Sequence, residues 1–269
     1  ILELHPKHVD ATTFAALMVA LGGDKENAVL FLKRAADLDK KHFECRLFLA
    51  EFALQDKKFQ EAAEYSSAAL AIRSHDETAL NIFGECMIQL KSYEQAIQPY
   101  ATLTEINHAN SHAWFRLGEA YTYRRRPTEA INAYKNFLNL NPNDMAVKYR
   151  VATLLEQTKD FHGAEALYVE LIEKFPENAD YVYRLAVTNV GLNIARAIDL
   201  FEKRLTMQPT KYEPYVQLAR IYLRKRDAEK ALAYYKQALA VEPKQVDAII
   251  GKALAYIQMG RKDDARVTL

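Results

Sequence analysis

The chain has 269 residues, of which 50% are hydrophobic and 26% are charged, and it contains only 8 Gly and 8 Pro. This is the composition of a globular protein with too few turn formers for a loop-rich β protein or a disordered segment, so helix is the expected state. Because 36 Lys and Arg face 35 Asp and Glu, the net charge of +1 excludes a whole-molecule field that would attract nucleic acid or an anionic membrane.

Cysteine content and apolar runs exclude further classes of protein. Two thiols, Cys45 and Cys86, provide neither a disulfide framework nor a four-ligand zinc site, and we interpret them as buried small hydrophobic residues. No apolar run reaches the roughly 18 residues of a membrane span, so none is expected within these residues. A cytoplasmic location is favoured, but the chain begins with Ile1 and a signal peptide upstream stays open.

Small residues recur at a fixed period in two series that run along the whole chain. Successive members lie 34 residues apart in both series, except for one step of 33 in each. Such a period is the signature of a repeat architecture. We call the series the first ladder, Ala16, Ala50, Gly84, Gly118, Ala152, Ala186, Ala219 and Ala253, and the second ladder, Ala28, Ala62, Ala96, Ala130, Ala164, Ala197, Ala231 and Ala265.

The spacing between the ladders locates one irregularity. The two members of a repeat lie 12 residues apart everywhere except at Ala186 and Ala197, which lie 11 apart. One residue is therefore missing in the turn near 191–193. Prolines with the same period mark the ends of helices, because proline has no N–H to donate; they are Pro142, Pro176, Pro209 and Pro243.

Between these marks the apolar residues follow the helical period of about 3.6 residues, as in Trp114, Leu117 and Tyr121. Each repeat is therefore predicted to be a helix, a short polar turn and a second helix. The small residues of both ladders allow the two helices to approach closely where they cross.

The segment 113–144 is similar to a tetratricopeptide repeat (TPR) at its signature residues, Trp114, Leu117, Gly118, Tyr121, Ala130, Tyr134 and Pro142, with Phe137 where a smaller residue is common. The resemblance covers the whole chain and implies an all-α fold, a right-handed α-solenoid superhelix of antiparallel helix-turn-helix units. In chain order, one array is expected, with repeats at 9–42, 43–76, 77–110, 111–144, 145–178, 179–211 and 212–245 and an incomplete one at 246–269. Residues 1–8, with Pro6, are expected to end a preceding repeat, so that the array is cut at both ends.

The resemblance further implies that the first helices of the repeats line a concave groove. Guanidinium groups bind carboxylates through a planar fork, and aromatic rings supply apolar contact. Because neighbouring helices lie about 8–10 Å apart and a strand rises about 3.3 Å per residue, we expect an extended peptide with an acidic residue at about every third position. The residues that predict it stand at positions five and six of three successive repeats: Phe115 and Arg116, Tyr149 and Arg150, and Tyr183 and Arg184.

Ion pairing within the scaffold is the alternative interpretation of two of these arginines. Position nine holds Glu85 and Glu119, each of which could pair with the arginine of the following repeat. Such pairs would contribute only about 0–1 kcal/mol each. Arg184 is expected to lack this partner, since position nine one repeat earlier is Thr153, and it is the main candidate. With the two glutamates, the groove is predicted to bind a ligand of mixed charge in one direction.

Other candidate sites have weaker support. The run Arg124, Arg125 and Arg126 is interpreted as cations that oppose a helix dipole, rather than as a site for phosphate or nucleic acid. His108 and His112 have no third ligand at metal-binding spacing. No Gly-rich phosphate loop and no Ser, His and Asp set is recognisable, so no catalytic residue, metal or cofactor is expected. The two-carboxylate clamp of chaperone-binding TPR proteins is disfavoured, because position five holds no Lys and position nine no Asn.

The sequence therefore predicts a protein–protein interaction scaffold, not an enzyme, that holds a partner peptide or protein segment and no nucleic acid. One alternative is the substrate-presenting arm of a larger enzyme or of a cell-envelope export or assembly machine. Another is self-association, in which one copy accepts another at its end surfaces or in its groove.

Overall fold

The computed structural model describes residues 8–269, and within that range it contains 16 α-helices and no strand. The predicted all-α fold is confirmed. The preceding repeat predicted at residues 1–8, with Pro6, lies outside the described residues except for His8. The chain divides into two compact units, an N-terminal unit that ends at Asn143 and a C-terminal unit, Asp144–Leu269.

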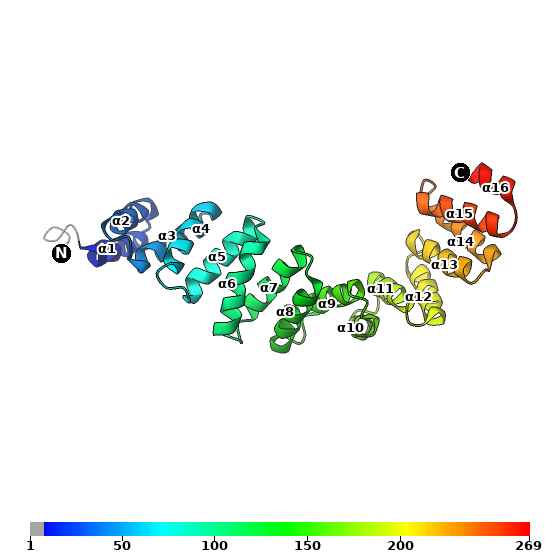
Figure 1. The fold of residues 1–269 in the computed structure, drawn as a ribbon, viewed down its shortest axis with the longest axis horizontal. Helices are drawn as coiled ribbons and strands as arrows, with labels where there is room; N and C mark the ends of the chain where they lie inside the picture. Colours follow the sequence, from blue (N-terminus) through cyan, green and yellow to red (C-terminus); the bar gives the residue numbers. More distant parts are fainter. Residues whose placement is uncertain (1–7) are drawn as a thin grey trace. The chain divides into compact units, whose positions relative to one another are not determined.

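Each unit consists of eight helices, and within a unit each helix packs against the next one along the chain (Figure 1). The helices of the N-terminal unit are α1 (Val9–Leu21), α2 (Lys25–Leu38), α3 (Phe43–Gln55), α4 (Phe59–Leu70), α5 (Glu77–Gln89), α6 (Tyr93–Ile106), α7 (Ser111–Tyr123) and α8 (Pro127–Leu140). Those of the C-terminal unit are α9 (Met145–Gln157), α10 (Phe161–Lys174), α11 (Ala179–Asn189), α12 (Ile194–Met207), α13 (Glu213–Arg224), α14 (Ala228–Val241), α15 (Val246–Gln258) and α16 (Lys262–Thr268).

Short side chains and prolines set the ends of these helices. The four periodic prolines lie two residues after the last residue of α8, α10, α12 and α14, and so mark helix ends as predicted. Eight helices begin after an Asp or Asn whose side chain accepts a backbone N–H of the first turn, a cap that stabilises a helix by about 1 kcal/mol. These capping residues are Asp24, Asp76, Asn110, Asp144, Asp160, Asn178, Asn193 and Asp227.

The turns inside the hairpins explain the missing residue. In seven of the eight described hairpins, one turn residue adopts a positive φ: Lys57, Lys91, Arg125, Lys159 and Arg226, with φ between 56° and 63°, and Gly23 and Gly260. The turn between α11 and α12, residues 190–193, contains no such residue among those described. The deletion that the ladder spacing predicts has therefore removed the left-handed turn residue of this hairpin.

Both ladders lie where the paired helices cross, as predicted. Every alanine of the second ladder is at most 4% exposed, and the first ladder is buried equally well. Gly118 shows how little room the crossing leaves, since a Cβ atom there would stand 2.6 Å from the ring of Tyr134. A Cβ on Gly84 would stand 2.9 Å from the ring of Tyr100. Close packing of the hairpins thus depends on side chains no larger than a methyl group.

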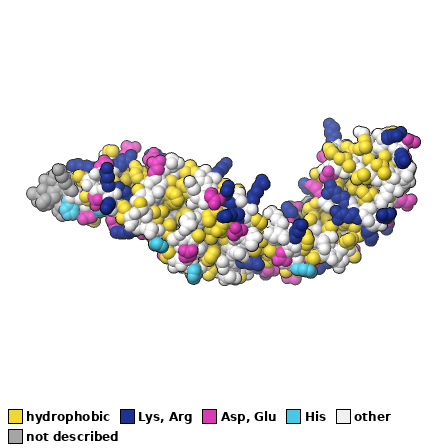
Figure 2. Space-filling view, viewed as in Figure 1, with side chains coloured by type: hydrophobic (Ala, Val, Ile, Leu, Met, Phe, Trp, Pro, Cys, Tyr) yellow, Lys and Arg dark blue, Asp and Glu magenta, His cyan; other side chains and the backbone are white. Residues whose placement is uncertain are grey.

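The surface of each unit carries charges of both signs. Figure 2 shows acidic and basic side chains interspersed over the visible face of each unit, with apolar side chains between them. Within residues 8–269, no helix has the length and apolar character needed to cross a bilayer. Recognition by charge must therefore depend on local groups, as the net charge of +1 indicates.

Candidate functional site

The predicted site residues of the N-terminal unit form an ion-pair network. The guanidinium of Arg116 on α7 lies 2.8 Å from Glu85 Oε2 on α5 and 2.9 Å from Glu119 Oε2 on its own helix. Tyr100 donates its hydroxyl to the Glu85 carboxylate at 3.4 Å. The predicted Glu85–Arg116 pair is present, and two carboxylates neutralise this arginine. The Glu85–Arg116 ion pair therefore has the geometry of a scaffold contact, because it joins two successive hairpins.

Phe115, which precedes Arg116, packs on the second helix of its own hairpin. Its ring centroid lies 6.0 Å from that of Tyr134 and 5.5 Å from that of Phe137, both on α8. The position that is small in many family members is thus filled by Phe137 and covered by Phe115. Phe115 contributes to the core of its hairpin, and only part of its ring is exposed.

The C-terminal unit brings three predicted residues to one cavity. Tyr149 on α9 and Tyr183 and Arg184 on α11 line a cavity of about 220 Å³. Tyr149 stacks at an angle against Tyr181, at 5.4 Å between centroids, which fixes its ring beside α11. Arg150 is exposed on α9, and its pairing with Glu119 of the other unit stays a prediction.

Arg184 does have a carboxylate partner, and the prediction that it lacks one is wrong. Its Nη1 lies 3.5 Å from Glu156 Oε2 on α9. Glu156 stands three residues after Thr153, nearly one helical turn, and so presents its carboxylate to the same neighbour. The same carboxylate accepts hydrogen bonds from Thr188 at 2.8 Å and from Tyr168 at 3.1 Å. Arg184 therefore shares a carboxylate with two hydroxyls, makes a long contact to it, and keeps 43% of its side chain exposed.

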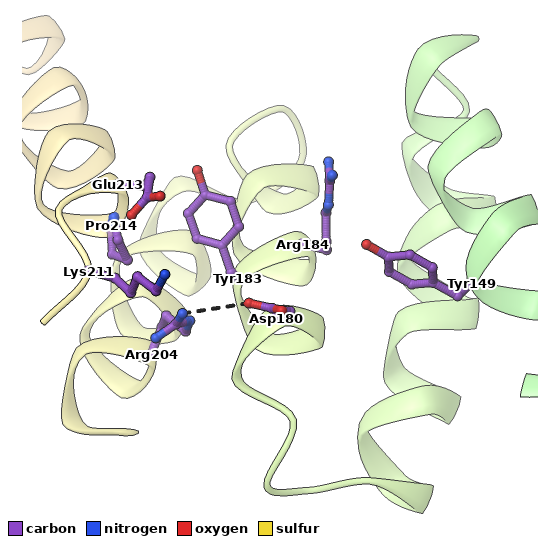
Figure 3. Close-up of a pocket in the computed structure, with 8 residues that line it drawn as sticks. All are labelled: Tyr149, Asp180, Tyr183, Arg184, Arg204, Lys211, Glu213 and Pro214. Carbon is purple, nitrogen blue, oxygen red and sulfur yellow. Dashed lines mark ion pairs between the residues drawn. The ribbon is translucent and has the colours of Figure 1, made fainter. Parts of the chain in front are cut away.

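Figure 3 shows how the cavity residues are arranged. Tyr149 points its hydroxyl toward Arg184 across the space between α9 and α11, and Tyr183 stands between Arg184 and the first turn of α13. Burial raises the pKa of the Tyr183 hydroxyl, against the effect of a hydrogen bond with Gln217, so the group stays a neutral donor. The cavity is lined by Tyr149, Asp180, Tyr183, Arg184, Arg204, Lys211, Glu213 and Pro214.

Arg204 on α12 is a functional candidate that the sequence reasoning missed. It is 3% exposed, and its Nη2 lies 3.6 Å from Asp180 Oδ1, the pair drawn in Figure 3. The sequence does mark it as an exception. Arg204 stands seven residues after a member of the second ladder, and in every other repeat that contains this position the residue there is apolar. These positions hold Ala35, Ala69, Leu103, Phe137, Leu171, Arg204 and Ala238.

A second cluster, in the N-terminal unit, has the order of a thiol triad but not its chemistry. His42 Nδ1 lies 3.1 Å from Cys45 Sγ, and His42 Nε2 lies 2.9 Å from Asp10 Oδ1. Cys45 is 0% exposed, and burial raises the pKa of its thiol, so the thiolate that such chemistry needs is disfavoured. The Nδ1 of His42 also accepts the backbone N–H of Cys45 at 3.3 Å. The cluster thus caps the start of α3, and the prediction that Cys45 is a buried small residue agrees with the structure.

Metal-binding groups do not converge in the described range. Among residues 8–269, no three His, Cys, Asp or Glu side chains lie close enough together to hold a metal ion. His108 lies in the loop between α6 and α7, where its ring contacts the backbone oxygen of Thr104, and His112 lies on α7 beside the ring of Tyr100. The two histidines therefore have separate structural contacts.

Comparisons with known proteins agree with this geometry. Two tetratricopeptide repeat models match the chain, one at residues 53–120 and 223–269 and the other at residues 111–144, together about half of its length. Superkiller protein 3 of Schizosaccharomyces pombe is 25% identical over 234 residues, which cover 82% of this chain and 14% of that protein. The type IV pilus assembly protein PilF of Pseudomonas aeruginosa is 25% identical over 215 residues, 77% of this chain and 85% of PilF.

A solved structure shows the same fold. YrrB, described as a TPR protein with an unusual peptide-binding site, superposes with a TM-score of 0.56 at 20% identity over 66% of this chain and 92% of YrrB. The chain spans 14% to 43% of the length of the first curated relatives it matches. The periodic ladders, the hairpins and the matching models lead to one conclusion: the chain belongs to the tetratricopeptide repeat family, whose helical arrays serve as scaffolds for protein–protein interaction.

Proposed function

We propose that the chain binds an extended, acidic segment of a partner protein on the first helices of its C-terminal unit, around Arg184. The observation that carries the proposal is the cavity between α9, α11 and α13, where an arginine and two tyrosines meet. A half-exposed guanidinium beside aromatic rings provides charge and apolar contact for one peptide at the same place. This proposal extends the general scaffold role of the family to a particular face and a particular ligand chemistry.

The contrast between Arg116 and Arg184 supports this location. Two carboxylates within 2.9 Å neutralise Arg116, and 23% of its side chain is exposed. A ligand carboxylate would have to displace both partners. Among the described residues, Arg184 has one carboxylate partner, Glu156 at 3.5 Å, and 43% of its side chain is exposed. A ligand can therefore bind Arg184 at a smaller cost in lost contacts, and we place the centre of binding in the fifth and sixth repeats.

A selection experiment tests this proposal. A random peptide library is panned on the full chain, and the peptides that bind are resynthesised with each Asp or Glu replaced by Asn or Gln. We expect acidic residues to be enriched and binding to weaken as salt rises. We expect Arg184→Ala to reduce affinity about three- to thirtyfold, or roughly 0.7–2 kcal/mol, which lies between the contribution of an exposed ion pair and that of a buried hydrogen bond to a charged group.

Arg196→Ala is the matched control for that substitution. Arg196 lies on α12 in the same unit, has 46% of its side chain exposed and pairs with one carboxylate, that of Glu165, at 2.5 Å. It differs from Arg184 in lying outside the cavity. Equal effects of Arg184→Ala and Arg196→Ala on every selected peptide would show that binding is centred elsewhere.

A second proposal is that the chain presents a partner to a larger assembly. The supporting observation is the similarity to PilF, which extends over 85% of a protein that is named for assembly of the type IV pilus. On this proposal the array binds another subunit of a complex, and mass spectrometry of a native complex purified through this chain would recover stoichiometric partners. The proposal would be rejected if the purified chain carried no other protein although the same extract still showed binding of the selected peptides.

A further inference from the structure

Arg204 places a charge where the other repeats of this chain have an apolar side chain. At the equivalent positions Leu103 and Leu171 are at most 1% exposed and belong to the packed interior of their hairpins. Moving a guanidinium from water into such a position costs free energy unless other groups compensate the charge. Packing alone therefore does not explain Arg204, since a leucine fits at this position in two other repeats.

The contacts of Arg204 compensate its charge incompletely. Within residues 8–269 its one ion-pair partner is Asp180, at 3.6 Å, and 82% of the Asp180 side chain is exposed to water. Gln208 accepts two hydrogen bonds, through Oε1 at 3.0 Å and through its backbone oxygen at 3.4 Å. The buried Nε has no hydrogen-bond partner within the described residues. Buried guanidinium groups usually have all their donors paired, so this side chain has capacity for a further acceptor.

The surrounding cavity brings basic and acidic side chains together. Arg184, Arg204 and Lys211 bring three positive charges to its wall, Asp180 and Glu213 bring two negative charges, and the charge of Arg184 is paired with Glu156 at 3.5 Å. A singly charged carboxylate would therefore be held by Arg204 and Lys211. A doubly charged phosphate would bring twice the negative charge against the two carboxylates of the wall at short range.

A hydrogen-bond acceptor without a partner lies in the same wall. Glu213 Oε2 is buried and has no hydrogen-bond partner among the described residues, and Figure 3 places Glu213 on the side of Tyr183 away from Arg184. A carboxylate ligand that also carries an N–H, such as a residue within a peptide, could use Arg204 for its charge and Glu213 for its N–H. The volume of about 220 Å³ suits one amino-acid side chain with its adjoining backbone.

We propose that this cavity is a carboxylate-anchoring pocket in which Arg204 and Lys211 hold one carboxylate of the partner. The proposal rests on the peptide-binding function proposed above and specifies which group of the peptide is recognised. The pocket differs from the arginine stripe along the first helices, because its main cation comes from a second helix and its second cation from the turn at Lys211. The carboxylate can be an acidic side chain or the free C-terminus of a peptide.

Nuclear magnetic resonance of arginine Nε–Hε groups tests the pocket without a known partner. The ¹⁵N-labelled full chain is titrated with N-acetyl-aspartate amide, which has only a side-chain carboxylate, and with N-acetylglycine, which has only a terminal one. N-acetyl-asparagine amide is the neutral control, and inorganic phosphate is the doubly charged competitor. We expect a saturable shift of the Arg204 Nε–Hε signal with at least one carboxylate probe, and at least tenfold weaker responses to the amide and to phosphate.

Arg204→Leu is the decisive variant, because two other repeats already have leucine at this position. Because this variant has no Arg204 Nε–Hε signal, probe binding is followed in all variants by the backbone amide shifts of Lys211 and Glu213. We expect Arg204→Leu to retain its helical circular dichroism and to bind the effective probe at least tenfold more weakly, and we expect Lys211→Gln to weaken binding about threefold. Probe binding that persists unchanged in folded Arg204→Leu would overturn the pocket, and so would a response to phosphate alone. The carboxylate that produces the larger shift identifies the source, side chain or terminus.

The outcome for the pocket can be separated from the outcome for the wider function. One result would reject the pocket and leave peptide binding standing. In it, selected peptides bind the wild-type chain through Arg184, and Arg204→Leu still prefers each acidic peptide over its Asn or Gln analogue as strongly as wild type does. If the small probes bind through Arg204 and no peptide of the library binds, the pocket stands and the peptide-binding function is wrong.

Discussion

Replacing Ala164 by Leu tests whether the second ladder sets the distance between paired helices. Ala164 lies on α10, and its side chain is 0% exposed at the crossing with α9. Leucine adds three carbon atoms to a position where all eight repeats have alanine. Inserting side-chain volume into a packed core costs about 1–3 kcal/mol, whereas the difference in helix propensity between Ala and Leu is only about 0.2 kcal/mol. We therefore expect Ala164→Leu to lower the free energy of unfolding by about 1–3 kcal/mol.

Ala166→Leu in the same helix is the matched control. Ala166 lies two residues away, on the exposed face of α10, and undergoes the same chemical change. Exposed substitutions usually change stability by less than about 0.5 kcal/mol. Thermal and urea unfolding followed by circular dichroism measure both variants, and a loss of 1–3 kcal/mol corresponds to a fall in the melting temperature of about 2–12 °C for a chain of this size.

Equal unfolding midpoints for Ala164→Leu and Ala166→Leu would refute the reasoning. That result would mean that the crossing has room for a large side chain, and that the alanines recur for a reason other than helix approach. A second contradiction would be a loss of helical signal in Ala166→Leu alone, because the exposed face has no packing partner to disturb.

Three further predictions concern other groups. Burial, together with the charge of Asp76, raises the pKa of Glu51, so the folded state binds the carboxyl proton more tightly than the unfolded chain does. Glu51→Gln should therefore be more stable than wild type at pH 7. This difference in the free energy of unfolding should shrink as the pH is lowered toward the ordinary glutamate pKa. A difference that grows toward acid pH would contradict it. Burial raises the pKa of Cys86 to about 11 and also raises that of Cys45. A thiol reagent at pH 8 should therefore label neither cysteine in native buffer and both in urea. Rapid labelling of either cysteine in native buffer would contradict its burial. Glu156→Gln removes the carboxylate that competes with an acidic ligand for Arg184, so it should tighten the binding of acidic peptides about two- to fivefold, measured by calorimetry. Unchanged or weaker binding would show that Glu156 does not compete with the ligand.

The sequence carries most of the information about the fold because hairpin packing repeats. Each crossing needs a small side chain at the same place, so the two ladders report the period, the phase and the site of the missing residue together. The identity of that residue needed the backbone angles, since only they show that positions such as Lys57 and Arg125 are left-handed. Helix pairing thus follows from local patterns, while the conformation of each turn follows from the way the two helices meet.

The candidate site was less predictable, because ion pairs depend on which helical turn faces a neighbour. Glu85 and Arg116 were paired correctly from their repeat positions, but Glu156 reaches Arg184 from a position one turn later than the one expected. Arg204 departs from its equivalents in the sequence, yet its burial, and the lack of a hydrogen-bond partner for its Nε in the described part of the chain, depend on how α12 and the turn before α13 enclose it. Periodicity identifies the exceptional residue, and only the packing shows what surrounds it.

A double-mutant cycle between Arg184 and one acidic residue of a selected peptide tests the central claim most directly. Affinities are measured by calorimetry for wild-type chain and Arg184→Ala, each with the acidic peptide and with its Glu→Gln analogue. If the segment lies along α9 and α11, one acidic position should show a coupling free energy of at least about 0.5 kcal/mol with Arg184, the range found for residues in contact. Additive effects at every acidic position of every selected peptide would contradict the account, because a ligand centred on Arg184 must lose its charge contact when either partner is neutralised.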